Sequence, residues 1–322
     1  MRALKHADAR ADRPCRSRYR QTPSAGAARS YGARTDTRNE IREFLTSRRA
    51  KLAPEQAGLP TFGSTRRVPG LRREEVALLA GVSVDYYTRL ERGHTGGVSE
   101  TVLEAIARAL QLDEAERSHL FDLARAQVTT SRPRRRSSPQ RVRPGVQRML
   151  DAMTGAPAYV RNGRLDLLAA NRLGYALYSE VFADPRRPVN SARFAFLDPR
   201  ATTFFGDWER VADDSVAILR GEAGRNPYDR DLSDLIGELS TQSEDFRVRW
   251  AKHDVRYHDT GLKRIHHPVV GDLELTYEAL TLRGDSELTL FAYTAEPGSR
   301  SDESLQLLAD WTAEPATISD QT

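Results

Sequence analysis

The apolar positions of the first 128 residues recur at intervals of three and four, which is the spacing of amphipathic helices. A first helix is expected from Thr37, which forms a capping pair with Glu40, to about Lys51. Two later helices are expected after Ser99 and after Asp113, each of which can cap the helix it precedes. The apolar side chains that define these three helices are Ile41, Phe44, Leu45, Leu52, Leu103, Ile106, Leu110, Leu120 and Leu123.

Between them, the segment LRREEVALLAGVSVDYYTRLERG predicts two short helices joined by a tight corner. Ala77 and Ala80 are small enough for a close helix crossing, and Gly81 tolerates the positive φ of the corner. Ser83 is placed to cap the second helix, and Gly93 can end it. Together with the neighbouring helices, this helix-turn-helix is expected to form a five-helix, all-α domain over residues 36–128 that resembles the lambda-repressor-like fold.

The pattern changes in the second half, where helical and extended segments are mixed. The segment YVRNGRLDLLAAN predicts a hairpin that turns at Asn162 and Gly163. Further strands are expected over residues 255–265, 273–282 and 288–294, because alternating or β-rich residues occur there. Helices are expected over residues 146–153, 172–182, 208–220, 231–239 and 246–253, and after Ser301. An α+β domain, with helices on one side of an antiparallel sheet, fits this order best.

Length and composition support two domains in a chain of 322 residues. We expect a disordered basic arm over 1–35, the first domain over 36–128, a basic linker over 129–145, the second domain over 146–313 and a tail over 314–322. No apolar run is long enough for a membrane span, and the polar start lacks a signal peptide's apolar core, so a cytosolic location is expected. Cys15, the single cysteine, excludes an internal disulfide framework.

Charge divides the chain unevenly. Residues 1–145 hold 29 Lys plus Arg against 16 Asp plus Glu, a formal charge of +13, whereas the remainder holds 20 against 29, or −9. A basic first half and an acidic second half indicate that only one part meets a polyanion, and nucleic acid is the natural candidate.

The second helix of the predicted helix-turn-helix has an outer face suited to the DNA major groove. Arg89 can donate two hydrogen bonds to guanine, Asp85 can accept one from cytosine, and Val84 can touch a thymine methyl group. Asp85 and Arg89 are also four residues apart, so a simple ion pair on a solvated helix is the alternative. The full set of expected DNA-contacting residues is Arg72, Arg73, Ser83, Val84, Asp85, Tyr86, Thr88, Arg89 and Arg92.

These motifs carry a family resemblance. PGLRREEVALLAGVSVDYYTRLERG resembles the helix-turn-helix of XRE-family bacterial transcription regulators, in the subgroup with an MmyB-like ligand-binding domain. LAANRLGYALYSE, FRVRWAKHDVR, HPVVGDLELTYEAL and FAYTAEPGS are similar to that second domain's recurring patterns. The resemblance extends from about Thr37 to Trp311.

The resemblance implies a PAS-like sensory domain and a homodimer that binds operator DNA in response to a small-molecule effector. It places DNA contacts at Arg73, Ser83, Val84, Asp85 and Arg89, and the capping of a helix beside the ligand pocket at Asn171. Related repressors commonly have amides where this chain has Val84 and Asp85, so the operator sequence cannot be carried over.

For the ligand, a PAS-like cavity suits a small, largely apolar or acyl-like molecule with a few polar anchors. Candidate pocket residues are bulky side chains and one titratable group, although each aromatic can equally be ordinary core. They are Tyr175, Phe204, Phe205, Trp208, Trp250 and His253.

Three other possibilities are weighed against this one. Metal binding is not expected, because adjacent His266 and His267 would face opposite sides of a strand, and His253 and His258 straddle a helix end. An enzyme is not expected either, since the chain has no nucleophile elbow, P-loop or GxGxxG motif. A second domain that binds another protein instead of a metabolite is the remaining alternative. No cofactor is expected.

Overall fold

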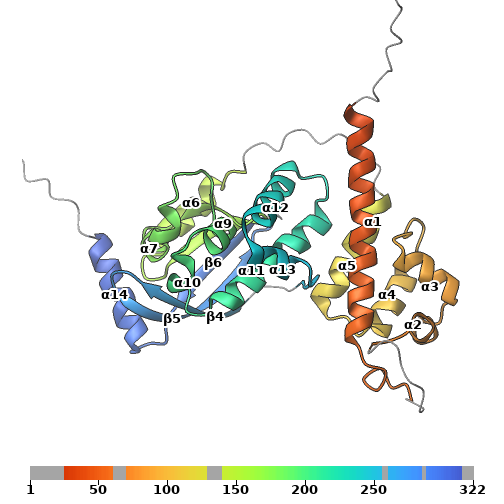
Figure 1. Ribbon diagram of the computed structural model, residues 1–322. Coiled ribbons are helices and arrows are strands. Elements are labelled where there is room, and N and C mark those ends of the chain that lie inside the picture. Colours follow the sequence, from red (N-terminus) through yellow and green to blue (C-terminus); the bar gives the residue numbers. More distant parts are fainter. Residues whose placement is uncertain (1–24, 61–69, 129–139, 256–259, 285–287, 314–322) are drawn as a thin grey trace, which may run out of the picture.

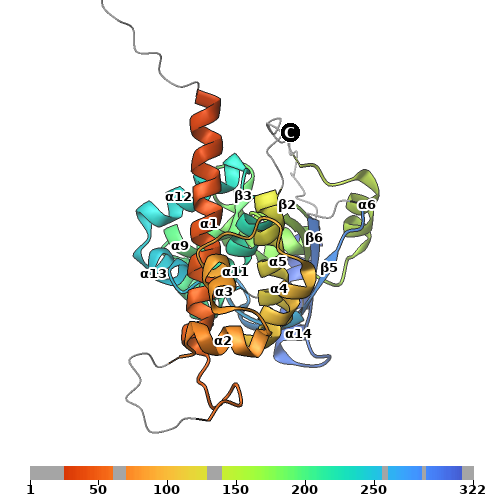
Figure 2. The same ribbon diagram turned by 90° about the vertical axis from the view of Figure 1, so that its right-hand side faces the viewer.

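The computed structural model describes residues 25–60, 70–128, 140–255, 260–284 and 288–313, with side chains of the first helix described from Thr37 onward. The chain forms a helical first lobe and a second lobe in which helices surround a sheet (Figure 1). Figure 2 views the molecule from the side of the first lobe, which lies in front of the second. The two lobes correspond to the two domains expected from the sequence.

Helices of the first domain follow the apolar spacing closely. Ser99 caps the fourth helix by accepting a hydrogen bond from the Val102 backbone N at 3.3 Å. At the start of the fifth, the side chains of Asp113 and Glu116 each accept a hydrogen bond from the other's backbone N–H, which confirms the expected cap. The helices are α1 (Ala25–Lys51), α2 (Arg73–Ala80), α3 (Val84–Glu91), α4 (Glu100–Ala109) and α5 (Glu114–Val128).

The first helix begins at Ala25, so the expected capping pair at Thr37 and Glu40 is wrong. Thr37 lies inside α1 and is buried. Residues 25–35, expected to belong to a disordered arm, lack apolar periodicity but contain four alanines, the strongest helix former. The rest of the expected arm, residues 129–139 of the expected linker and the tail lie outside the described residues.

The second domain contains an antiparallel sheet whose six described strands have the order β3-β2-β1-β6-β5-β4. The hairpin β1–β2 turns through Gly163, Arg164 and Leu165, and Leu165 has a φ of 67°. The strands are β1 (Ala158–Asn162), β2 (Asp166–Ala170), β3 (Val189–Asn190), β4 (Thr260–His267), β5 (Gly271–Thr281) and β6 (Leu288–Thr294). The expected antiparallel sheet is confirmed.

Helices lie on both faces of this sheet, so the expectation that they cover one side is wrong. Val146 and Leu150 of α6 (Pro144–Ala152) pack against Val160 and Leu290, which point away from the other helices. The remaining helices cover the opposite face, whose core includes Tyr159 and its neighbours on β5 and β6. They are α7 (Arg172–Leu177), α8 (Ser179–Phe182), α9 (Ser191–Leu197), α10 (Ala201–Phe204), α11 (Trp208–Arg225), α12 (Arg230–Gln242), α13 (Glu244–Trp250) and α14 (Arg300–Ala313).

The two domains share a packed junction. His119 of α5 lies directly against Gly224 of α11, where a Cβ atom would meet the imidazole ring at 2.7 Å. Val255, which follows α13, is buried in the same hydrophobic cluster as Phe44 and Leu120 of the first domain. The second domain therefore contributes to the core of the first.

Asn171 connects α7 to the start of the sheet. Its Oδ1 accepts hydrogen bonds from the backbone N of Gly174 at 2.7 Å and of Ala158 at 2.9 Å, and its Nδ2 donates to the carbonyl oxygens of Met153 and Ala156. The expected capping role of Asn171 is thereby confirmed. Because Asn171 draws α7 so close to β1, a Cβ at Gly174 would collide with the Ala158 carbonyl.

We therefore expect Gly174→Ala to lower the free energy of unfolding by about 2 kcal/mol or more, because backbone atoms cannot move aside. Chemical denaturation measures the change. Gly237→Ala is the matched control, since Gly237 lies in α12 with no atom within 4 Å of its Cβ position. This control should be neutral or should stabilise the protein by up to about 1 kcal/mol. Equal stabilities for the two variants would contradict the close packing of α7 on β1.

His119 makes the junction sensitive to acid. Burial, with no hydrogen-bond partner for either ring nitrogen, lowers the pKa of His119 to about 3. The unfolded chain takes up this proton below about pH 6.5, so stability falls as the pH drops from 6.5 towards 3, by at most about 1.4 kcal/mol per unit. Above pH 6.5 the ring is neutral in both states and the effect vanishes.

His119→Leu should flatten this part of the profile relative to the wild type, as measured by chemical denaturation at pH 4 to 7. His94→Leu, at an exposed histidine of the same domain, serves as the control and should leave the profile unchanged. Parallel acid slopes in the wild type and in His119→Leu would contradict a buried, neutral His119.

Candidate functional site

The helix-turn-helix has the corner and caps that its sequence predicts. Gly81 ends α2 with a φ of 66°, the left-handed region that favours glycine. Ser83 Oγ accepts a hydrogen bond from the Tyr86 backbone N at 3.1 Å and so begins α3. Gly93 follows α3 with a φ of 82°. These local features fix the direction in which α3 leaves the corner.

The outer face of α3 is open to solvent. Ser83, Val84, Asp85, Arg89 and Arg92 are all exposed. Among the described residues, the Arg89 side chain makes no hydrogen bond or ion pair, so the alternative pair between Asp85 and Arg89 does not form. The guanidinium is therefore available to a partner outside the chain.

The other expected DNA-contacting residues are more constrained. Tyr86 and Thr88 are half-buried, and Tyr86 packs against the core of the first domain. Arg72 is half-buried and lies 3.4 Å from Glu74, whereas Arg73 is half-exposed and pairs with Glu91. The structure thus places the whole expected set along α2 and α3, with Arg89 and Arg92 the most freely presented cations.

A buried carboxylate holds the recognition surface to the rest of the domain. Glu91, at the end of α3, accepts a hydrogen bond from Arg49 Nε of α1 at 2.7 Å and another from Arg73 of α2. Arg49 also donates to the Leu71 carbonyl oxygen at 2.9 Å. One carboxylate therefore joins three helices, which sequence spacing did not predict.

At the junction of the domains, Arg220 of α11 is 1% exposed. Its Nη1 donates to Glu40 Oε2 of α1 at 2.6 Å and to Nδ1 of His253 at 2.8 Å, and its guanidinium lies 4.1 Å from the centre of the Trp250 ring. Because arginine only donates, Nδ1 of His253 accepts, and its Nε2 faces Glu43 at 3.1 Å. Burial alone would raise the pKa of Glu40, but His253 and Arg220 outweigh it and hold that pKa below its usual value.

A second set of charges closes the same junction. Arg48 of α1 donates to the His253 carbonyl oxygen, lies 3.3 Å from Asp254 and pairs with Glu116 of α5 at 2.8 Å. Lys51 reaches the same Asp254 carboxylate at 2.5 Å. Acidic and basic groups of α1 thus meet groups of opposite sign on the second domain.

The six candidate pocket residues lie at different places in the second domain, where Trp208 packs against the cluster that holds Phe204 and Phe205. Phe204 and Phe205 are in the core beneath the sheet, Tyr175 is exposed, and Trp208 donates from Nε1 to the Ala195 carbonyl oxygen at 2.8 Å. Trp250 and His253 line one groove of about 630 Å³ between α1 and the α12–α13 region. Helical spacing identified these bulky side chains but not the surface that each faces.

The described histidines are separated. His266 is exposed and 2.6 Å from Asp272, whereas neighbouring His267 is buried and 3.0 Å from the Ala176 carbonyl oxygen. The prediction that the two face opposite sides is confirmed. His258 lies outside the described residues, among which no group of three His, Cys, Asp or Glu side chains could hold a metal.

Sequence reasoning missed a polar cluster inside the second domain. The hydroxyl of Tyr293 on β6 lies 3.1 Å from that of Tyr159 and 2.8 Å from that of Tyr178. Arg161, two residues after Tyr159 on β1, is buried on the same face with its guanidinium 4.6 Å from the Phe291 ring centre. The signal was present, because a charged residue occupies a core-facing position of an alternating strand.

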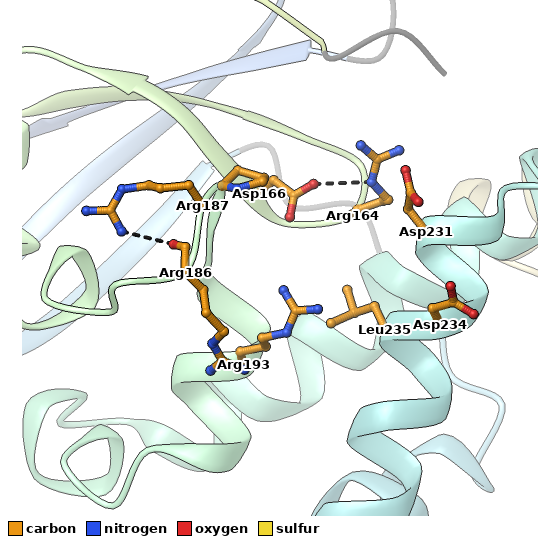
Figure 3. A pocket seen from close by; sticks show the side chains of 9 residues that line it. Arg164, Asp166, Arg186, Arg187, Arg193, Asp231, Asp234 and Leu235 are labelled. Carbon is orange, nitrogen blue, oxygen red and sulfur yellow. Dashed lines mark hydrogen bonds and ion pairs between the residues drawn. The ribbon is translucent and has the colours of Figure 1, made fainter. Parts of the chain in front are cut away.

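A polar cleft of about 460 Å³ lies between the β1–β2 hairpin and α12 (Figure 3). Four arginines line it, but three of them are compensated by acids. Arg164 pairs with Asp166 and Asp229, and Glu238 lies 3.2 Å from Arg186 and 2.8 Å from Arg193. Asp231 and Asp234 also line the cleft, so it carries no excess of positive charge.

Comparison with known families agrees with this geometry. Residues 40–120 match the helix-turn-helix domain family, and residues 142–308 match the MmyB-like transcription regulator ligand binding domain. No curated protein matches the chain. Within the described residues, no helix is both long enough and apolar enough to cross a membrane. Since the second match alone covers more than half of the 322 residues, the chain belongs to the MmyB-like transcription regulators, with a DNA-binding helix-turn-helix domain followed by a ligand-binding domain.

Proposed function

We propose that this regulator, of the XRE type, binds a specific operator as a homodimer and responds to a small, largely apolar or acyl-like effector in a PAS-like second domain. α3 enters the major groove, and the dimer places two such helices about one DNA turn apart. The observation that carries the proposal is the free guanidinium of Arg89 on the exposed face of α3.

Several features of α3 support recognition of DNA bases by its exposed face. Arg89 can form a bidentate pair with guanine, which is the commonest specific contact in the major groove. Ser83 and Arg92 flank it and are exposed, as phosphate-contacting groups must be. The hydrogen bonds from Arg49 and Arg73 to Glu91 hold α3 in a fixed position against α1 and α2. The Arg89 side chain is therefore pre-organised for contact with a base.

Arg89→Ala should reduce the discrimination between the preferred operator and random DNA by about 1 to 3 kcal/mol, which is roughly 5- to 150-fold. The preferred site is first enriched from a random duplex library with wild-type protein. Fluorescence anisotropy at one fixed salt concentration then gives the affinity of each variant for that site and for random DNA.

Arg108→Ala is the control. Arg108 is exposed on α4, and its substitution removes one positive charge, as Arg89→Ala does. It should leave the ratio between the two affinities unchanged. An unchanged ratio in Arg89→Ala as well would remove Arg89 from base recognition.

The effector's influence must reach the DNA-binding domain, and α11 supports a direct route. Val211, near its start, packs in the core beneath the sheet. Arg220 and Gly224, nearer its end, contact Glu40 of α1 and His119 of α5. A shift of α11 on ligand binding therefore changes the junction, and DNA and effector affinities become reciprocally coupled.

Arg220→Met should uncouple the domains, because removal of one partner from a buried charge cluster costs about 3 kcal/mol and takes the guanidinium donor away from Glu40 and from His253 Nδ1. All three tryptophans, Trp208, Trp250 and Trp311, belong to the second domain, so their fluorescence reports the unfolding of that domain, and Trp250 also reports its separation from α1. In the wild type we expect this signal and the far-ultraviolet circular dichroism to change together during denaturation.

In Arg220→Met the two signals should separate into distinct transitions. Arg210→Met, at an exposed position of the same helix, is the control and should keep them coincident. Coincident transitions in Arg220→Met would exclude Arg220 as the coupling residue.

A further inference from the structure

Large apolar side chains are exposed on the outer surface of α14 and α7. Leu307 and Trp311, one helical turn apart on α14, are 63% and 59% exposed. Tyr175 of α7 is exposed as well, with its ring centre 4.6 Å from that of Phe182. Tryptophan and tyrosine are the residue types that contribute most to protein interfaces, so their exposure here points to a contact with a partner.

These side chains form one continuous patch. α14 packs against α7, and Leu308 of α14 belongs to the same buried cluster as Leu173 of α7. Both helices therefore cover the same face of the sheet, and their outer faces lie side by side. Val269, exposed in the turn between β4 and β5, adjoins α14, because Ser304 Oγ donates to the neighbouring Val270 carbonyl oxygen at 3.4 Å. A contiguous apolar surface of this kind marks an interaction site.

Charged residues of both signs border the patch. Arg172 of α7 and Arg300 of α14 are exposed, as are Glu303 and Asp310 of α14. None of these four side chains forms an ion pair with any described residue. Their charges sum to zero, whereas residues 146–322 together carry −9. Two copies of this acidic domain therefore repel each other in general, but not at this surface.

The patch lies at the end of the molecule opposite the DNA-binding helix. Figure 1 shows α14 at one end and α2 and α3 at the other, so a partner on α14 leaves the exposed face of α3 free. Two copies joined through α14 have their α3 helices at the outer ends of the pair, too far apart for one DNA turn. This surface is therefore distinct from the interface that pairs two α3 helices on one operator.

We propose that the patch of Tyr175, Val269, Leu307 and Trp311 binds the same patch of a second copy that is attached to another operator, so that the regulator joins two DNA segments. This inference rests on the proposed function only in that the chain binds operator DNA. A contact between identical patches requires a self-complementary surface. An apolar centre with a rim of balanced charge meets that requirement, since the arginines of one copy can face the carboxylates of the other.

The size of the patch determines the strength of this contact. Its four exposed side chains present on the order of 400 Å² of apolar surface, about half of what each partner buries in a stable interface. Contact between free molecules is therefore weak. Attachment to one DNA molecule raises the effective concentration of the two copies, so that a weak contact is sufficient there. A second copy held nearby by DNA thus fits the patch better than a freely diffusing partner.

Sedimentation velocity of the operator-bound protein tests the contact. A fluorescent duplex that carries the operator enriched with wild-type protein is saturated with each variant, and its sedimentation is followed as the concentration of the complex rises. The wild type should form complexes that contain two duplexes. Trp311→Glu and Leu307→Glu should each weaken this association by about 30-fold or more, the effect of losing one interface hot spot. Val248→Glu, at an exposed valine of α13, is the matched control and should retain it.

A DNA molecule with two operators gives an independent measurement. Wild-type protein should occupy the two sites cooperatively in a footprinting titration. Trp311→Glu should fill each site independently, with the affinity for a single operator unchanged, which also shows that the variant is folded.

Wild-type complexes that contain one duplex at every concentration would overturn the proposal, as would two-duplex complexes that persist in both Trp311→Glu and Leu307→Glu. A loss of affinity for a single operator in both variants would overturn it too, because the patch would then belong to the operator-binding dimer. Failure of the proposed function looks different, since the wild type would then show no preference for any DNA sequence.

Discussion

The molecule depends on one buried guanidinium that cannot be left without partners. Arg220 projects from the second domain, yet its carboxylate partner, Glu40, belongs to the first. A buried charge needs a group of opposite charge or hydrogen-bond acceptors close to it. The two domains are therefore held in one relative arrangement. His253, the Trp250 carbonyl oxygen and the Trp250 ring complete its surroundings. A few polar groups at the junction therefore determine how the second domain packs against the first.

Two regions of the chain place positive charges in buried positions, and they differ in how those charges are paired. At the junction, Arg220 pairs with Glu40 and Arg48 pairs with Asp254, in each case an acid of the neighbouring domain. Beneath the sheet, Arg161 and Lys263 form no ion pair with any described residue. α11 passes close to both regions, since Asp214 influences Lys263 and Arg220 meets α1. A displacement of α11 would therefore act on both regions at once.

Much of the first domain was predictable because its rules are local. Gly81 and Ser83 determine a corner and a cap by their own conformational and hydrogen-bonding properties, and apolar spacing located α2 to α5. The start of α1 was not predictable, because alanines favour a helix without producing a periodic pattern of apolar residues.

In the second domain, β3, α9 and α10 were missed; they have two, seven and four residues, and segments this short give a weak periodic signal. The site residues divide in the same way, into those set by local sequence and those set by contacts distant in sequence. Exposed positions of α3 follow directly from helical periodicity, whereas the surroundings of Trp250 and His253 depend on contacts with α1, which is distant in sequence. Arg220 could have been noticed, because it lies four residues after Val216, on the buried side of α11.

The position of Val255 has a consequence for how such regulators can be recombined. This side chain, which follows the last helix of the α11–α13 group, fills part of the core formed by Phe44, Leu120 and their neighbours in the DNA-binding domain. A chimera that joins this DNA-binding domain to a foreign sensor after α5 would lack that side chain and leave a void under α1. The functional boundary between the two domains therefore does not coincide with a single cut in the chain, and a transplantable DNA-binding unit has to carry a replacement for residues 253–255.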